Sequence, residues 1–289
     1  MNPKVWIEAA LNGAWTKRVQ PRIPVSVNET IEDGIAAAQA GAAILHIHAY
    51  DEKSGVQNDD PATYAKIIEG IKAEVDVIIY PTISSAAQAG SEVGVVGAYR
   101  YEPATHLGQL GHLEWAIVDP GSVNFSTLDD IRADQLGMVY MNVESDIRTG
   151  FAIAEKFGAH PTMALYEPGF IRLAAAVSAR YPALRQPIYR FMFSEQFTFG
   201  FPVARYGLDA YLAQLARFAP GAPWMVATLG GDITPLIPDV VSLGGHVRVG
   251  LEDAVFGCQK SNADLVTEAV EAISLAGGSP ASAQDVRAA

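Results

Sequence analysis

The sequence predicts an α/β protein of the (β/α)8 class, a closed TIM barrel formed as a single domain over residues 1–289. Short apolar runs alternate with helical patterns eight times along the chain. No Gly-rich phosphate turn follows the first run, as an open doubly wound sheet would require. The eight runs are VWIEAAL, AAILHIHAY, VDVIIYPTI, LEWAIVD, TMALYE, IYRFMF, WMVATL and HVRVGLE. They are almost continuously apolar, which is typical of strands buried on both faces.

The segments between these runs have a helical period and recognisable ends. One segment opens at Asn28, carries acidic residues in its first turn and stops at Gly41. The next begins with Asp60-Pro61, a typical helix start. Four of its apolar side chains fall on one helical stripe: Tyr64, Ile67, Ile68 and Ile71. Further helices are expected in residues 145–158, 170–181, 208–219, 234–245 and 262–278.

Three regions fit the barrel pattern less cleanly. Residues 86–109 form a long Gly-rich passage where the third helix is expected. Residues 125–142 look like an inserted turn or hairpin after the fourth strand. Residues 279–289 resemble a low-complexity tail.

The composition limits the possible partners. The net charge of −12 argues against nucleic acid or an anionic membrane as the main partner. The apolar runs are too short for a transmembrane helix, and the N-terminus has no secretion signal. The single cysteine, Cys258, excludes an internal disulfide and favours a cytoplasmic location. Only 18% of the residues are charged, so we expect a homo-oligomer, a dimer or tetramer, to cover apolar surface.

Two histidines end the second apolar run. His46 and His48 are two residues apart, so on a strand they project from the same face, near the end where barrel active sites are built. Glu252 ends the eighth strand, which a closed barrel separates from the second by one strand, or about 10 Å. Two imidazoles and a glutamate, with a fourth position open, form a catalytic zinc set.

Other interpretations of these residues remain open. A buried histidine is often a hydrogen-bonded core residue, and Asp253 could simply cap the following helix. The barrel context and the Glu252-Asp253 pair at a second strand end favour the metal site. The remaining histidines have no comparable pairing and are interpreted as structural: His106, His112, His160 and His246.

Four segments, LNGAWTK, HIHAYD, GSVNF and GGHVRVGLEDAVF, occur in this order across essentially the whole chain and resemble the β-keto acid cleavage enzymes. The resemblance implies zinc bound by His46, His48 and Glu252. It also implies an acyl transfer in which a β-keto acid and acetyl-CoA give acetoacetate and a new acyl-CoA. Asp253 would be the general base that removes the C2 proton, and Arg248 would hold the substrate carboxylate or a developing oxyanion.

The strand-eight segment poses a geometric problem for this assignment. Arg248, Gly250 and Glu252 share one strand face, whereas Asp253 should point the other way. The strand must therefore end or bend for Asp253 to reach the site.

Further polar residues at predicted strand ends are candidates for contact with the substrate. Thr82 stands where the family often has serine and would orient the substrate or Asp253, although it could also pack by its methyl group. Four candidates for substrate binding are Asn12, Ser122, Asn124 and Glu167. Each of these four could instead cap a helix or shape a turn.

The chain also departs from the family pattern. Ala14 stands where an acid often follows the first strand, Ile117 where threonine is usual, and Asp119 where asparagine is common. The segment MFSEQFTFGFP lacks the Gly-rich turn that meets CoA in many relatives. Two alternatives therefore stay open: a CoA-independent, metal-dependent aldolase or hydrolase, and a barrel that binds a metal or ligand without turnover. A base beside the metal favours an enzyme.

Overall fold

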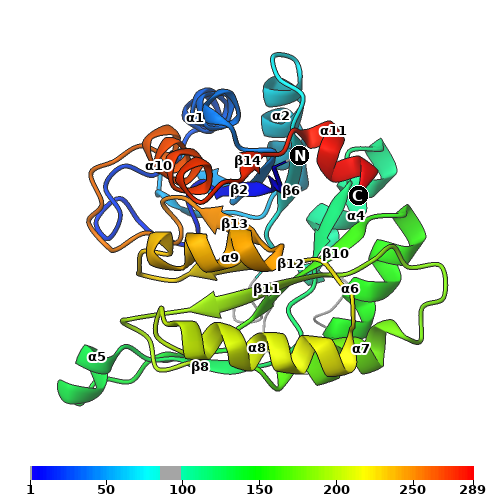
Figure 1. Ribbon diagram of the computed structural model, residues 1–289. Coiled ribbons are helices and arrows are strands. Elements are labelled where there is room, and N and C mark those ends of the chain that lie inside the picture. The colour runs from blue at the N-terminus through cyan, green and yellow to red at the C-terminus, as the bar shows by residue number, and fades with distance from the viewer. Residues whose placement is uncertain (1, 85–98) are drawn as a thin grey trace. The chain divides into compact units, whose positions relative to one another are not determined.

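The computed structural model describes residues 2–84 and 99–289, in which strands and helices alternate along the chain (Figure 1). The fold is a (β/α)8 TIM-barrel fold with eight parallel strands, and each of the eight predicted apolar runs overlaps one of them. The fold class predicted from the sequence is therefore confirmed. The chain divides into two compact units, Met1–Thr82 with Met225–Ala289 and Ile83–Trp224.

Five parallel strands of the first unit run in the order β6, β3, β2, β13, β12. Their bounds are Ile78–Pro81, Ile44–Ile47, Ile7–Ala10, His246–Val249 and Trp224–Thr228. The register sets Ala10 beside His46 and Glu8 beside Arg248. Strand β2 thus lies between the strand of the histidines and the strand of Arg248, as the sequence predicts.

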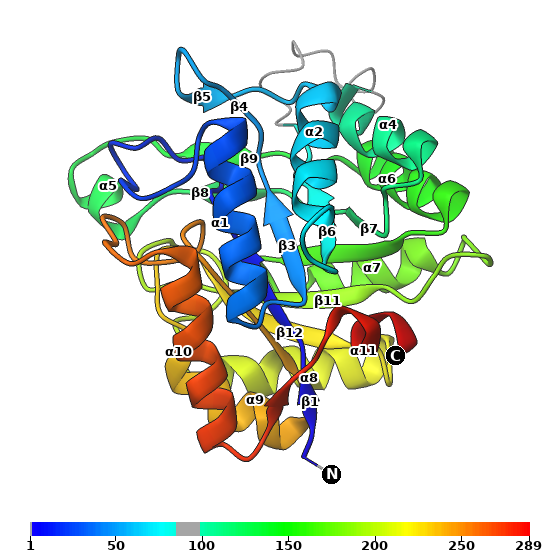
Figure 2. The ribbon, with the colours of Figure 1, turned by 90° about the horizontal axis from the view of Figure 1, so that it is seen from above.

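Helices cover these strands on the outside. Figure 2 shows α1 and α2 side by side next to β3, and α10 beside α1. The bounds are Val27–Ala40 for α1, Pro61–Lys72 for α2, Ile237–Leu243 for α9 and Asn262–Leu275 for α10, with a 3₁₀ turn, η1, at Thr234–Leu236. The apolar faces of these helices are buried against the strands, which accounts for their amphipathic sequences.

The observed N-caps of α1 and α2 can be compared with the helix starts predicted from the sequence. Asp60 caps α2 as predicted, and its carboxylate accepts hydrogen bonds from two backbone amides of the first turn. The predicted stripe of α2 is fully buried. The predicted opening of α1 at Asn28 is wrong, because Ser26 caps this helix and forms a capping box with Glu29.

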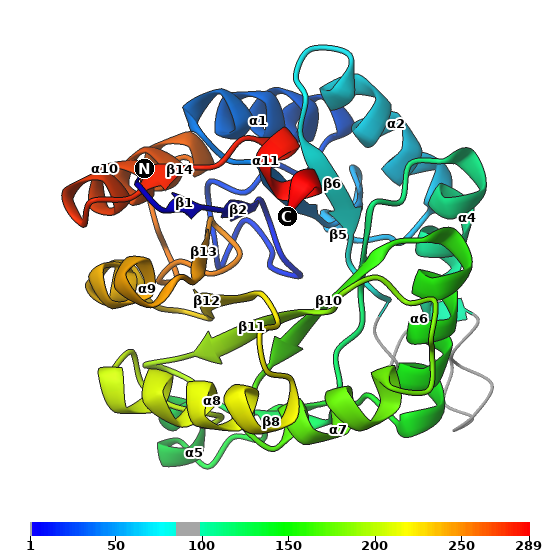
Figure 3. The ribbon, with the colours of Figure 1, turned by 45° about the vertical axis from the view of Figure 1, so that its right-hand side comes forward.

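The predicted low-complexity tail is also wrong. Strand β14 (Ser279–Pro280) pairs in parallel with β1 (Lys4–Val5), and helix α11 (Ala283–Ala288) follows it. Ser282 and Asp285 form a capping box at the start of α11, and Asp285 lies 3.4 Å from Lys4 Nζ. Figure 3 shows the N-terminal label beside β1 and β14 and the C-terminal label at α11. Small residues here form a strand edge and a helix cap rather than a disordered tail.

In the second unit, three parallel strands run in the order β11 (Ile188–Phe193), β10 (His160–Leu165), β7 (Trp115–Ile117). The helices are α4 (Glu102–Leu110), α6 (Glu144–Phe157), α7 (Phe170–Ser178) and α8 (Arg205–Phe218). The predicted insertion is an antiparallel hairpin of β8 (Val123–Phe125) and β9 (Met138–Tyr140), with α5 (Leu128–Arg132) between them. Residues 86–98 of the predicted Gly-rich passage lie outside the described residues.

In residues 2–84 and 99–289, each helix is too short or too polar to cross a lipid bilayer.

His246 at the start of β13 predicts a specific loss of stability in acid. Its ring stacks on Trp6 at 3.9 Å between centroids, and its Nδ1 accepts a hydrogen bond from the Trp6 amide at 3.2 Å. Burial lowers the pKa of His246 from 6.5 to about 3, so the unfolded chain binds its proton more readily than the folded protein does. The stability gained from neutral His246 is complete above pH 6.5 and declines as the pH falls towards 3.

Urea unfolding of the wild type and of His246→Gln at pH 7 and pH 4.5 measures this contribution. The wild type should lose more free energy of unfolding than the variant between these pH values, by on the order of 2 kcal/mol. Equal losses would contradict the assignment, because both proteins share every other titrating group.

Candidate metal centre

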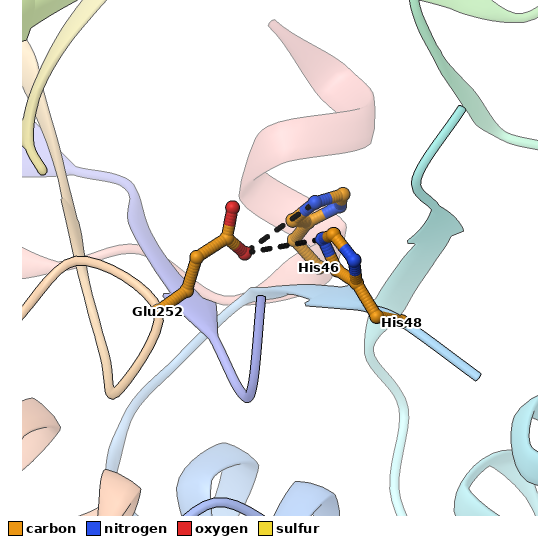
Figure 4. A group of neighbouring side chains, drawn as sticks. All are labelled: His46, His48 and Glu252. Carbon is orange, nitrogen blue, oxygen red and sulfur yellow. Dashed lines mark ion pairs between the residues drawn. The ribbon is translucent and has the colours of Figure 1, made fainter. Parts of the chain in front are cut away.

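The three predicted metal ligands lie together in the first unit (Figure 4). Glu252 Oε2 is 3.5 Å from His46 Nε2 and 3.6 Å from His48 Nε2. Two ligand atoms that bind one tetrahedral zinc at about 2.0–2.1 Å are roughly 3.3–3.4 Å apart. Both distances to Glu252 are therefore close to the spacing that one shared cation requires, and all three ligand atoms lie within 4.8 Å of one another. In the described part of the chain, this is the one such group of His, Cys, Asp and Glu residues.

Two of the ligand atoms also lack hydrogen-bond partners. Within residues 2–84 and 99–289, neither Glu252 Oε2 nor His48 Nε2 makes a hydrogen bond, although both atoms are buried. A buried polar atom without a partner costs about 1–3 kcal/mol, so two of them facing each other need a common partner. A cation between them would satisfy both.

The charge balance of the cluster also indicates a bound cation. Arg248, only 2% exposed, contacts three carboxylates: Glu8, Glu252 and Asp253. With these carboxylates ionised and the histidines neutral, the one guanidinium faces three negative charges in a buried site, an excess of two. Buried charge is costly unless it is paired, and a divalent cation would neutralise this excess. Two nitrogens and one carboxylate oxygen also match the ligand preference of Zn²⁺.

Glu252 is held in the charged form that a metal requires. Burial opposes its ionisation, but the Arg248 guanidinium at 2.8 Å, followed by the two histidines when they are protonated, holds the pKa of Glu252 well below 4.5. The carboxylate is therefore ready as a ligand throughout the pH range in which imidazoles are neutral.

A turn after β13 brings Asp253 into contact with Arg248. The strand ends at Val249, and Gly250 turns the chain with a φ of +133°. The Asp253 amide then donates to the Gly250 carbonyl at 3.1 Å. Arg248 Nε and Nη2 each donate to one oxygen of Asp253 at 2.8 Å, in a bidentate pair. The predicted bend is confirmed. Gly250 is required here because a Cβ would lie 2.3 Å from the Ala10 carbonyl oxygen.

Glu8 on β2 is a buried acid that sequence reasoning missed. It is 0% exposed, and its Oε1 accepts hydrogen bonds from Arg248 Nη1 at 3.2 Å and from the Tyr80 hydroxyl at 2.5 Å. The sequence does give one indication of Glu8, because it is the one charged residue in the apolar run VWIEAAL. Arg248 thus contacts a candidate metal ligand and two further carboxylates at once. Burial disfavours its charged form, but Asp253, Glu252 and Glu8 hold the pKa of Arg248 well above its usual value.

The backbone around Glu252 is tied to distant segments. Trp15 Nε1 donates to the Glu252 carbonyl at 2.8 Å, and Gln20 Nε2 donates to the Leu251 carbonyl at 2.9 Å. The buried Asn262 accepts from the Leu251 amide at 2.8 Å. These contacts fix the ligand loop in one conformation. No sequence motif marks them, because the partners are far apart along the chain.

The other predicted residues of the first unit lie around His48. Asn12 Nδ2 donates to the Pro24 and His48 carbonyls at 3.0 Å each, and its Oδ1 accepts from the His48 amide at 2.9 Å. Asn12 therefore supports the backbone of a candidate metal ligand. The Thr82 amide donates to the Ile47 carbonyl at 3.0 Å, so Thr82 follows β6 next to the end of β3. Contact of Asn12 or Thr82 with substrate stays a prediction.

Three predicted substrate-binding residues belong to the second unit. Ser122 Oγ exchanges hydrogen bonds with the Asn142 backbone, and Asn124 is exposed on β8. Glu167 Oε1 accepts from the Gly200 amide at 3.2 Å. Their contact with substrate also stays a prediction.

Gly13 is expected to be essential for the position of Glu252. Its φ is +63°, and a Cβ there would lie 2.6 Å from Glu252 Cγ. Gly13→Ala should therefore displace the carboxylate and weaken zinc binding, about 10-fold or more. Gly55→Ala is a matched control, because Gly55 has a φ of +66° and nothing within 4 Å of its Cβ position.

Both variants carry the backbone strain of a side chain at positive φ, about 1–3 kcal/mol, and should lose similar stability from it. Only Gly13→Ala should also lose zinc in a chelator competition. Equal zinc affinity in the two variants would show that Gly13 does not constrain the ligand.

The fold and the cluster define a (β/α)8-barrel enzyme with a candidate metal centre built from β3 and the loop after β13. The chain belongs to the β-keto acid cleavage enzyme family, whose model matches residues 4–289. The family resemblance and the prediction of an enzyme are thereby confirmed.

Relatives cover most of the chain. It is 30% identical over 277 residues to a 3-keto-5-aminohexanoate cleavage enzyme of Fusobacterium nucleatum, covering 93% of this chain and 91% of the relative. It is 27% identical to a 3-oxoadipate:acetyl-CoA acetyltransferase of Cupriavidus necator, covering 86% and 80%. Among solved structures, ObcA with oxaloacetate is similar in fold, with a TM-score of 0.67 at 18% identity, covering 93% of this chain and 67% of ObcA.

Proposed function

We propose that this chain cleaves a β-keto acid by acyl transfer with acetyl-CoA, giving acetoacetate and a new acyl-CoA, with Zn²⁺ as its metal. The observation that carries the proposal is the buried cluster of His46, His48 and Glu252 beside the Arg248–Asp253 pair. Relatives named as acetyl-CoA transferases of 3-oxoadipate and of 3,5-dioxohexanoate support acetyl-CoA as the second substrate.

The proposed site residues have two roles: some bind a Lewis acid, and one transfers a proton. Zn²⁺ held by His46, His48 and Glu252 would polarise the keto oxygen of the substrate, which makes the C2 protons more acidic. Asp253 is the general base that removes one C2 proton. Arg248 contacts both oxygens of Asp253 and one of Glu252, so it links the base to the candidate metal ligand. It is also proposed to hold the substrate carboxylate or a developing oxyanion.

The reaction then balances without a redox partner. The C2 carbanion adds to the thioester carbonyl of acetyl-CoA and displaces the CoA thiolate. The thiolate attacks the original keto carbon, and the bond from that carbon to C2 breaks. Asp253 returns its proton to C2 of the released acetoacetate. Thr82 is proposed to orient the substrate or Asp253. Asn12, which contacts the His48 backbone, remains a proposed substrate-binding residue.

The proposal also covers the predicted residues of the second unit, the cellular compartment and the oligomeric state. Ser122, Asn124 and Glu167 remain proposed substrate-binding residues. Cys258 carries no disulfide, which favours a reducing compartment, so we place the reaction in the cytoplasm. A homo-oligomer is proposed from the low charge density of the chain.

A panel of β-keto acids with different tails, incubated with and without acetyl-CoA, tests the function. Formation of acetoacetate and a new acyl-CoA only when acetyl-CoA is present supports the proposal. Cleavage without acetyl-CoA would instead identify a metal-dependent aldolase or hydrolase. Zinc binding with no product in either arm would identify a barrel that binds metal without turnover.

A further inference from the structure

His48 is connected to a chain of polar side chains on the side of its ring away from Glu252. His48 Nδ1 lies 2.9 Å from Gln57 Oε1, and Gln57 Nε2 donates to Asp59 Oδ1 at 2.8 Å. The Tyr64 hydroxyl donates to the same Asp59 oxygen at 3.0 Å. All four residues belong to the first unit.

The order of donors and acceptors in this chain follows from Asp59. An ionised carboxylate only accepts hydrogen bonds, so Gln57 must present its amide nitrogen to Asp59 and its oxygen to His48. Oxygen also only accepts, so His48 Nδ1 must carry the hydrogen. Burial, followed by the Asp59 charge, raises the pKa of Tyr64 well above its usual value, which keeps its hydroxyl a donor to Asp59.

The backbone holds Gln57 in this position. Gln57 lies in β5 (Val56–Gln57), which pairs with β4 (Tyr50–Asp51) in an antiparallel hairpin, with Tyr50 opposite Gln57. The Asn58 amide donates to the Ala49 carbonyl at 2.8 Å, which ties the hairpin to the residue after His48. The hairpin that follows His48 thus folds back and places an acceptor beside its ring.

We propose that Asp59, acting through Gln57, fixes His48 in the Nδ1–H tautomer and so directs the Nε2 lone pair at the metal position. Gln57 and Asp59 are positioning residues, because each acts on the metal position through His48. The inference rests on the proposed metal site, since the lone pair that it orients is the one that faces Glu252 at 3.6 Å. The opposite tautomer would point a hydrogen at the cation.

Zinc-free protein with ¹⁵N-labelled histidine tests the tautomer directly. Long-range ¹H–¹⁵N spectra should show a protonated Nδ1 and an unprotonated Nε2 for His48 in the wild type. Asp59→Asn allows the Gln57 amide to reverse, because an asparagine oxygen or nitrogen can face it. This variant should therefore gain the Nε2–H form, although residue 59 does not touch His48.

Zinc affinity, measured by chelator competition, should follow the tautomer. Gln57→Leu and Asp59→Asn should each lose roughly 10–100-fold in affinity. Tyr64→Phe, which leaves the order of donors unchanged, should lose about 3-fold or less. Asn58→Leu is the matched control, since Asn58 is exposed on the same hairpin and should bind zinc like the wild type.

The outcomes separate this inference from the proposed function. A wild-type His48 with hydrogen on Nε2, or unchanged affinity and spectra in Gln57→Leu and Asp59→Asn, would overturn the inference. Absence of zinc binding in the wild type would overturn the proposed function, and the spectra of the zinc-free proteins would still decide the tautomer. If Gln57→Leu does not fold, Asp59→Asn alone decides.

Discussion

Glu252→Gln is expected to abolish tight zinc binding and with it the cleavage reaction. The amide keeps the shape of the side chain but removes the charge that pairs with Arg248 at 2.8 Å and faces both imidazoles. A neutral amide is a much poorer zinc ligand than a carboxylate. We expect zinc to fall from one per chain to near zero after dialysis, and activity to fall at least ~1,000-fold, as for loss of a Lewis acid worth several kcal/mol.

A matched substitution controls for charge alone. Glu268 is exposed on α10 and pairs with Lys260, so Glu268→Gln makes the same chemical change away from the site. It should keep zinc and activity. Stoichiometric zinc in Glu252→Gln would show that the carboxylate is not a ligand.

Asp253→Asn is expected to separate metal binding from catalysis. The variant keeps all three metal ligands, and Arg248 keeps its contacts with Glu8 and Glu252. Zinc should therefore remain bound. Turnover should fall by about 10²–10⁴-fold, the usual contribution of a general base.

The proton step can be followed without acetyl-CoA. In D₂O, the wild type should exchange the C2 protons of a β-keto acid faster than the uncatalysed rate, and Asp253→Asn should not. Unchanged enzyme-catalysed exchange in the variant would assign the base to another residue. Loss of zinc from the variant would show that Asp253 also supports the metal site.

The fold and the arrangement of the three candidate ligands were predictable because they depend on local sequence patterns. Buried parallel strands are apolar along their whole length, so His46 and His48 stood out at a strand end. The two-residue period placed both imidazoles on one face, and the neighbouring strand order brought Glu252 to them. Both steps depend on backbone geometry alone.

Features that depend on tertiary partners were not predictable in this way. Ser26 rather than Asn28 caps α1 because Glu29 reaches back to the cap, and both residues are common at helix starts. Gln57 and Asp59 resemble ordinary hairpin residues until the hairpin is seen beside His48. Residues 279–289 form β14 and α11 because Lys4 and Val5 offer a strand edge, and no local pattern shows that edge.

Diffraction at the zinc absorption edge from crystals grown with one equivalent of Zn²⁺ shows whether His46, His48 and Glu252 bind one shared zinc ion. We expect one anomalous peak per chain, about 2.0–2.2 Å from His46 Nε2, His48 Nε2 and a Glu252 carboxylate oxygen. A peak at other residues, or none at this site in protein that cleaves β-keto acids, would contradict this expectation.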